Sequence, residues 1–177
     1  DLHIRSGQTV GILGGTGSAK TTLVSLIPRL YEASEGTVKV GGRPVADYTM
    51  EHLRESVSVV LQKNTLFSGT IRENLLWGNP EATEEEMIQA AKDAQAYDFV
   101  MSFPDGFDTN MAQGGVNVSG GQKQRLALAV NLVADKDIYV FDEATSNIDI
   151  ESEAIIMDNI KAMSKNKSVI VISHRLA

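Results

Sequence analysis

The chain has 177 residues, of which 42% are hydrophobic and 22% charged, so it is long enough to bury the core of one α/β domain. Its net charge of −7 and its pI of about 4.9 disfavour a nucleic-acid groove, so no nucleic acid is expected among its partners. It contains no cysteine, which excludes disulfides and thiolate metal sites. No apolar run approaches the roughly 18–20 residues that a membrane span needs.

The first motif is a glycine-rich turn between a predicted strand over Thr9–Leu13 and a predicted helix over Thr22–Ile27. In such a turn successive backbone N–H groups can point towards a polyphosphate at the start of the helix. A glycine-rich turn that binds nothing is the alternative, which the order of strand, loop, Lys-Thr and helix disfavours. The residues of this predicted phosphate cradle are Gly14, Gly15, Thr16, Gly17, Ser18, Ala19, Lys20, Thr21 and Thr22.

Two side chains of the cradle have predicted roles. Lys20 would reach the β- and γ-phosphates of a nucleotide, and the Thr21 hydroxyl would hold Mg²⁺. Ala19 stands where this pattern usually has a second glycine, which serves close approach and permissive backbone dihedrals. We expect the extra methyl group to cost some affinity without abolishing the site.

The middle of the chain predicts a hairpin, a strand and a helical region. Gly36–Gly42 is typical of a hairpin with Gly41 and Gly42 as the turn, and Val57–Leu61 is typical of a strand. The segment from about 72 to 134 reads as mostly helical, with a helix that starts near Ala82–Glu86.

Near the end of the helical region, a Ser-Gly-Gly-Gln sequence precedes an amphipathic stretch that runs to Ala134. A helix that begins there would present an anion site at its N-terminus. The alternative is a flexible Gly-Gly loop before a helix. The residues of this motif are Ser119, Gly120, Gly121 and Gln122.

Two acidic residues follow a predicted buried strand over Asp137–Phe141. The carboxyl ends of strands line the crevice in which open α/β sheets bind ligands. There, Asp142 would support Mg²⁺ through its water shell, and Glu143 would polarise the water that attacks the γ-phosphate. In the alternative, both acids cap a helix that starts at Ala144–Ser146.

With these motifs in this order, the chain resembles the nucleotide-binding domain of an ATP-binding-cassette (ABC) transporter. Gln62 matches the glutamine of the Q-loop, and Ser119–Gln122 match the signature motif. Ser146–Asp149 match the D-loop. His174 follows a third apolar strand and matches the switch histidine. The alternative is that His174, like most lone histidines at strand ends, is only a polar residue with satisfied hydrogen bonds. Leu66–Leu75 resembles the stretch after the Q-loop in exporter-type cassettes.

The resemblance implies an α/β fold with a P-loop NTPase (RecA-like) core and an inserted helical subdomain, truncated at both ends. The core would comprise residues 1–71 and 135–177, and the helical subdomain with the signature motif about 72–134. An aromatic residue that stacks on adenine would lie upstream of Asp1.

The same resemblance implies how the site is shared. ATP would lie between the cradle of one domain and the signature motif of a second, with Asp149 of the D-loop also at the nucleotide. The implied catalytic residues are Glu143, His174 and Gln62, and the implied Mg²⁺ ligands are Thr21, Gln62 and Asp142.

The implied function is the binding and Mg²⁺-dependent hydrolysis of ATP to power export. The expected partners are a second nucleotide-binding domain, in a homodimer or heterodimer, and a transmembrane permease domain at the cytoplasmic face of the cell membrane. The alternatives are a non-transport ABC ATPase and a regulatory cassette that binds ATP with little turnover. Glu143 argues against the second, because degenerate sites commonly lose that base.

Overall fold

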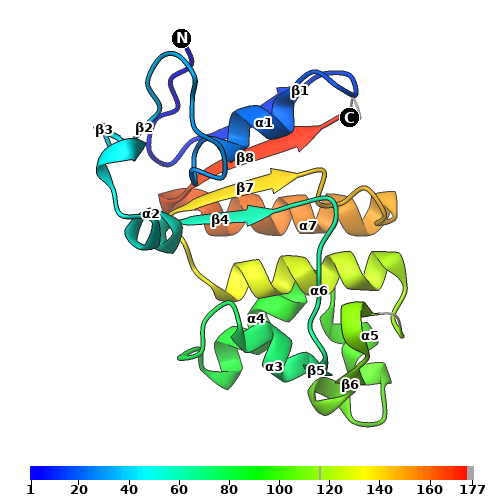
Figure 1. The fold of residues 1–177 in the computed structure, drawn as a ribbon. Coiled ribbons are helices and arrows are strands. Elements are labelled where there is room, and N and C mark those ends of the chain that lie inside the picture. Colours follow the sequence, from blue (N-terminus) through cyan, green and yellow to red (C-terminus); the bar gives the residue numbers. More distant parts are fainter. Residues whose placement is uncertain (116, 175–177) are drawn as a thin grey trace. The chain divides into compact units, whose positions relative to one another are not determined.

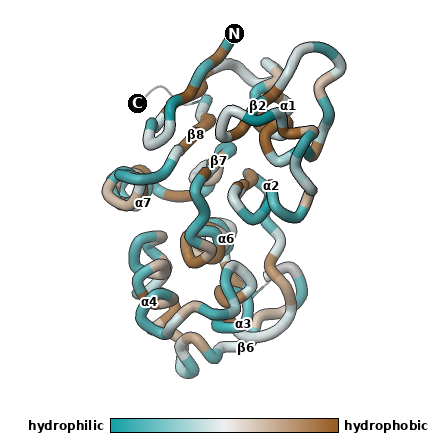
Figure 2. The backbone as a smooth tube through the Cα atoms, turned by 90° about the vertical axis from the view of Figure 1, so that its left-hand side faces the viewer, coloured by the Kyte–Doolittle hydropathy of each residue, from teal (hydrophilic) through white to brown (hydrophobic). Residues whose placement is uncertain are grey.

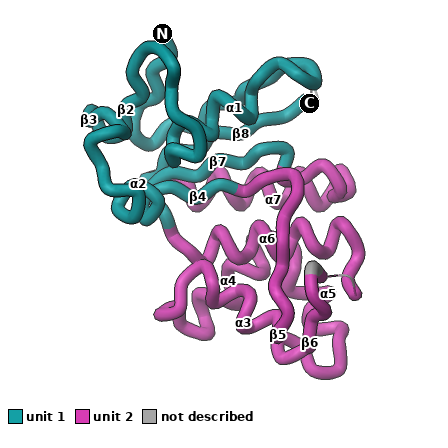
Figure 3. The backbone as a smooth tube through the Cα atoms, in the orientation of Figure 1, with its two compact units in different colours: residues 1–59, 136–143, 166–177 teal, residues 60–135, 144–165 magenta. Residues whose placement is uncertain are grey.

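The computed structural model describes residues 1–115 and 117–174, and it divides the chain into two compact units (Figure 3). Unit 1 comprises residues 1–59, 136–143 and 166–177, and unit 2 comprises residues 60–135 and 144–165. The predicted limits of the core and of the helical subdomain stay a prediction.

Unit 1 is built around a sheet whose strands lie in the order β1, β8, β7, β4 (Figure 1). β1 pairs in parallel with β8, and β8 pairs in parallel with β7. Its helices and strands are β1 (Thr9–Leu13), α1 (Lys20–Ser25), β2 (Lys39–Val40), β3 (Arg43–Pro44), a 3₁₀ helix (Val45–Asp47), α2 (Met50–Ser56), β4 (Val57–Val60, whose last residue belongs to unit 2), β7 (Ile138–Asp142) and β8 (Ser168–Ser173).

The register of this sheet brings three strand ends to one edge. Leu13 pairs with Ser173, and Asp142 pairs with Ile172. Since parallel strands end on the same side, whatever follows β1, β7 and β8 lies at a common carboxyl edge. The core that holds these strands together includes Val140 on β7, together with residues of α1 and β8. Its fully buried members are Val24, Val140, Ile170 and Ile172.

The predicted hairpin is present as β2 and β3, in which Val40 pairs with Arg43. Gly41 and Gly42 connect the strands with φ angles of 58° and 77°. A two-residue turn with both φ angles positive matches the twist of the strands it joins, and glycine enters that conformation without a Cβ clash.

Unit 2 is mostly helical. Its longest helices are α6 and α7, and Figure 2 shows the hydrophobic segments of α6 in brown. Its helices and strands are β5 (Gly69–Thr70), α3 (Ile71–Leu76), α4 (Glu84–Asp93), α5 (Tyr97–Ser102), a 3₁₀ helix (Gly106–Asp108), β6 (Asn110–Met111), a 3₁₀ helix (Gln113–Gly115), α6 (Gly120–Val133), α7 (Ile150–Met163) and a 3₁₀ helix (Ser164–Asn166, whose last residue belongs to unit 1).

Helix α6 forms the core of unit 2. Leu126 and Leu128 on this helix are almost completely buried, as are Met87 and Ala91 on α4. The connection after α3 approaches α6 very closely at Gly78, where an added Cβ would lie 2.0 Å from the carbonyl oxygen of Val130. No side chain fits at that contact, so glycine is required there.

The predicted α/β class with a parallel sheet is confirmed, whereas one local alternative is wrong. The helix after Asp142 and Glu143 begins at Ile150 and is capped by Asp149, so the two acids do not cap it. Helix α1 begins at Lys20, two residues before its predicted start. Within residues 1–115 and 117–174, no helix combines the length and the apolar character that crossing a bilayer requires.

Candidate nucleotide-binding site

The glycine-rich loop after β1 wraps around the ammonium group of Lys20. Nζ donates hydrogen bonds to the carbonyl oxygens of Gly14 at 2.6 Å and Gly15 at 2.8 Å, and to Oγ of Ser18 at 3.0 Å. The lysine is 9% exposed. A buried ammonium group needs such partners, because an unpaired charge away from water is costly. The same cation is positioned to exchange these oxygens for those of a phosphate.

Ala19 adopts the left-handed backbone conformation, with φ 59° and ψ 20°, immediately before α1. For an L-residue that conformation costs roughly 1–2 kcal/mol, because Cβ crowds the following carbonyl oxygen. Glycine avoids this cost. From the sequence, we expected the methyl group of Ala19 to hinder the approach of the backbone to phosphate. The structure shows in addition that the backbone of Ala19 is strained.

We expect Ala19→Gly to bind ATP as well as the parent or up to about fivefold more tightly, because glycine lets the backbone approach phosphate without a Cβ in the way. Titration of a fluorescent ATP analogue measures the change. Ala134→Gly is the matched control, because Ala134 at the end of α6 has an ordinary helical φ of −62°. Much weaker binding by Ala19→Gly would contradict this account of the loop.

Thr21 and Asp142 place two oxygens side by side. The Thr21 hydroxyl donates to Oδ2 of Asp142 at 2.6 Å, and Asp142 is 4% exposed. A hydroxyl and a carboxylate are hard oxygen donors of the kind that Mg²⁺ takes from a protein when phosphates and waters complete its shell. Among residues 1–115 and 117–174, no three histidine or carboxylate side chains gather in a way that could hold a metal. The pair therefore fits a cation that arrives with a nucleotide.

Glu143 and His174 lie together at the same carboxyl edge. Oε1 of Glu143 is 3.0 Å from Nδ1 of His174, and the side chains are 20% and 43% exposed. Glu143 has a φ of 50°, and its N–H donates to the carbonyl oxygen of Ile172 at 3.1 Å. A non-glycine residue held in the left-handed region stores strain, and such residues cluster at functional sites.

In unit 2 the signature residues form the start of α6. Oγ of Ser119 accepts from the N–H of Gln122 at 3.1 Å, and Oε1 of Gln122 accepts from the N–H of Ser119 at 3.1 Å. This reciprocal capping box fixes the first turn. The alternative of a flexible loop is therefore wrong for these residues. A Cβ added at Gly120 would meet nothing within 4 Å, so the surface at Gly120 is open.

Asp149 caps α7 rather than lying free. Oδ1 accepts from the N–H of Ser152 at 2.8 Å, and Oδ2 accepts from Nη2 of Arg125 at 2.7 Å. The hydrogen bonds from the N–H and side chain of Ser152 hold the pKa of Asp149 below its usual range, with a smaller contribution from Arg125.

The structure thus gathers part of the predicted site within unit 1. The gathered residues lie at the carboxyl edge of the sheet or in the first turn of α1, and they are Lys20, Thr21, Asp142, Glu143 and His174. Gln62, Ser119–Gln122 and Asp149 belong to unit 2. Sequence reasoning missed Gln124 and Arg125, although their spacing from Gly121 could have indicated a shared helix face.

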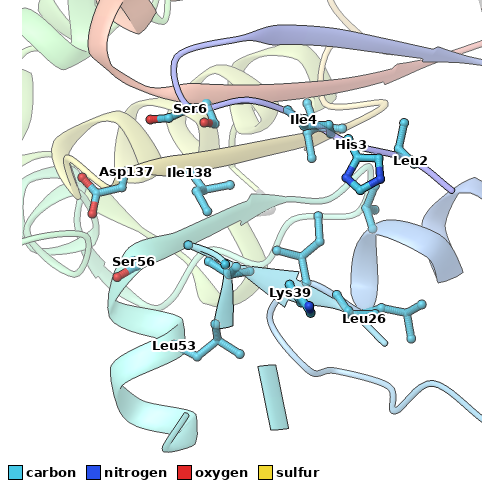
Figure 4. A pocket seen from close by; sticks show the side chains of 18 of the residues that line it. Leu2, His3, Ile4, Ser6, Leu26, Lys39, Leu53, Ser56, Asp137 and Ile138 are labelled. Atoms are coloured by element: carbon cyan, nitrogen blue, oxygen red, sulfur yellow. The ribbon is translucent and has the colours of Figure 1, made fainter. Parts of the chain in front are cut away.

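Unit 1 also contains a cavity of about 1030 Å³ (Figure 4). Leu2, Ile4, Leu26, Leu53 and Ile138 contribute apolar side chains to its wall, and none of the predicted site residues lines it. The cavity is therefore separate from the phosphate cradle.

Comparison with known proteins decides the family. The family model described as "ABC transporter" matches residues 1–146. The chain belongs to the ABC transporter family. The predicted resemblance is thereby confirmed.

Relatives and a solved structure agree with this assignment to the ABC family. A "Putative multidrug export ATP-binding/permease protein" of Staphylococcus aureus strain NCTC 8325 is 43% identical over the whole chain, which covers 31% of that protein. Its counterpart in strain bovine RF122 is 42% identical with the same coverage. The "Structure of a bacterial Atm1-family ABC exporter with ATP bound" matches with a TM-score of 0.92 and 36% identity, covering 96% of this chain and 30% of that chain. The chain spans about a third of the length of these ABC proteins.

Proposed function

We propose that the chain is the ATP-binding and ATP-hydrolysing part of an ABC exporter. The observation that carries the proposal is the hydrogen bond from Thr21 to the buried carboxylate of Asp142 beside the Lys20 cradle, with Glu143 and His174 at the same sheet edge. The relatives are named for both an ATP-binding and a permease function, and the similar solved structure is named as an exporter with ATP bound.

The chemistry follows from the positions of these side chains. Lys20 would exchange the loop oxygens for those of the β- and γ-phosphates. Thr21 and Asp142 would hold Mg²⁺, which would neutralise phosphate charge. Glu143 accepts a proton from the water that attacks the γ-phosphorus, and the products are ADP and inorganic phosphate. His174 contacts Oε1 of Glu143 and so fixes the orientation of that carboxylate.

We further propose that two such domains share each ATP. The residues Ser119–Gln122 would meet the γ-phosphate held by a second copy or a related domain, with Asp149 of the D-loop also at the nucleotide. Gln62 would serve as a catalytic residue and as an Mg²⁺ ligand. The remaining partner is a transmembrane permease, with the domain at the cytoplasmic face of the membrane. Residues 1–71 and 135–177 would act as the catalytic core, and about 72–134 as the helical subdomain.

The proposal predicts that Lys20→Ala weakens ATP binding about 10- to 150-fold. Charge-assisted hydrogen bonds contribute roughly 1.5–3 kcal/mol each, and one such bond to phosphate is the net loss once the bonds to Gly14 and Gly15 are released. Titration of a fluorescent ATP analogue against the intact protein measures it. Lys39→Ala is the matched control, because this exposed lysine of β2 is not part of the cradle.

Equal affinity in Lys20→Ala and the parent would reject the cradle as the ATP site. The parent should also release phosphate from ATP only when Mg²⁺ is present. ATP binding with almost no phosphate release would instead favour a regulatory cassette over an exporter ATPase.

A further inference from the structure

Gln124 is a buried amide in the second turn of the signature helix, and it forms hydrogen bonds with residues of two other predicted motifs in unit 2. The side chain is 3% exposed. Its Nε2 donates to the carbonyl oxygen of Gln62 at 3.3 Å and to Oγ of Ser146 at 3.1 Å, while its Oε1 accepts from the N–H of Asn147 at 2.9 Å. Glutamine suits this position because one amide supplies two donors and an acceptor at once.

Two neighbours on the same face of α6 reinforce the contact with the D-loop. A Cβ added at Gly121 would lie 2.9 Å from the carbonyl oxygen of Asn147, so helix and loop touch closely there. Nη2 of Arg125 donates to Oδ2 of Asp149 at 2.7 Å and to Oγ of Ser152 at 3.1 Å. Positions 121, 124 and 125 are separated by three and four residues, which places them on one side of a helix.

We propose that Gln124 is a positioning residue that couples the Q-loop, the signature helix and the D-loop of one subunit. This inference rests on the proposed function, because it assumes that a nucleotide is bound against Ser119–Gln122. When the first turn of α6 shifts towards that nucleotide, the buried amide moves Asn147 and the Gln62 backbone with it. Closure on one nucleotide therefore adjusts the backbone of the Q-loop and of the D-loop together, through α6.

The coupling is carried by the amide, since its three hydrogen bonds cannot be replaced by water at a site with 3% exposure. Removing the amide while keeping its volume leaves the Gln62 carbonyl and the Asn147 N–H without this partner. The loops would then lose their fixed register on α6. The cradle residue Lys20 belongs to unit 1, and its bonds to Gly14 and Gly15 do not involve α6. The variant should therefore form less of the closed state, whereas the affinity of a single domain for ATP should not change.

The test is Gln124→Met in the intact protein, with kcat and KM for ATP measured separately. We expect kcat to fall about tenfold and KM to stay within about twofold. General destabilisation would lower only the fraction of protein that binds nucleotide, so kcat per nucleotide-binding protein would not change. Asn131→Met is the matched control, because this amide on the same helix donates to Ala127 O within α6. Its kcat should stay within about twofold of the parent value.

A second measurement uses ATP retained through rapid gel filtration with Mg²⁺ by the slow-hydrolysing Glu143→Gln variant. Adding Gln124→Met should reduce retained ATP at least about fivefold while ATP binding at equilibrium is unchanged. Ser146→Ala removes the hydroxyl that accepts from Gln124 Nε2 and should lower kcat about two- to threefold, so it serves if Gln124→Met does not fold. Unchanged kcat and retention in both variants would overturn the inference. Failure of Glu143→Gln itself to retain ATP would instead count against the proposed function.

Discussion

Replacing Glu143 by glutamine is expected to leave ATP binding intact and to lower the rate of hydrolysis by about 10²- to 10⁴-fold, the usual contribution of a positioned general base. Glutamine keeps the size of the side chain and faces no new backbone strain, because both residues carry the same Cβ at φ 50°. It also remains within reach of Nδ1 of His174, which lies 3.0 Å from Oε1. What it loses is the ability to accept a proton from water.

Phosphate release and equilibrium ATP binding, measured on the same preparation, separate these effects. Glu151→Gln is the matched control, because it makes the same change at an exposed acid in the first turn of α7 and should leave both quantities unaltered. Because ATP then persists, the variant should accumulate in its ATP-bound, closed state. Normal turnover in Glu143→Gln would assign the base to another group, and His174 would be the next candidate.

Placing an acid at the start of the signature helix is expected to reduce ATP hydrolysis about 10³-fold without affecting the affinity of a single domain for ATP. If a second domain supplies the γ-phosphate there, two like charges about 4 Å apart repel by roughly 4 kcal/mol at an effective dielectric near 20. Sequence reasoning selects Gly121→Asp for this test. The structure favours Gly120→Asp, because a Cβ at Gly120 meets nothing within 4 Å, whereas one at Gly121 would lie 2.9 Å from the Asn147 carbonyl oxygen.

Gly120→Ala is the matched control, since it adds the Cβ without the charge and should retain most of the activity. Gly121→Ala measures the steric effect on the D-loop alone. The readouts are the ATPase rate of the intact protein and ATP affinity by titration. Loss of ATP affinity in Gly120→Asp, or equal loss of activity in Gly120→Ala and Gly120→Asp, would count against a site shared between two domains.

The elements that the sequence predicts well are those whose signals are local. The apolar run of Thr9–Leu13 forms a strand with the predicted bounds, and Gly41 and Gly42 form the predicted turn. Ser119 and Gln122 cap α6 because a capping box needs only residues three apart. The family itself could be predicted for the same reason, since its motifs are short and ordered.

The segment 144–149 could not be predicted, because contacts distant in sequence hold it out of the helix. Thr145 Oγ1 donates to Oε1 of Glu153 at 2.5 Å, and the N–H of Asn147 donates to Gln124, which is 23 residues away. The second bond uses a backbone N–H that a helix would otherwise use, and α7 starts only at Ile150. The left-handed conformation of Ala19 could not be predicted either, because alanine does not favour that conformation.

The loop around Lys20 has a consequence for how a nucleotide enters. Nζ of Lys20 donates to Gly14, Gly15 and Ser18, so the hydrogen-bonding groups of the loop and of the ammonium satisfy one another. An incoming phosphate must displace these oxygens from the ammonium group. Association therefore has two steps, an encounter with ATP and then an exchange of hydrogen-bond partners at Lys20. The rate constant of the second step does not depend on ATP concentration.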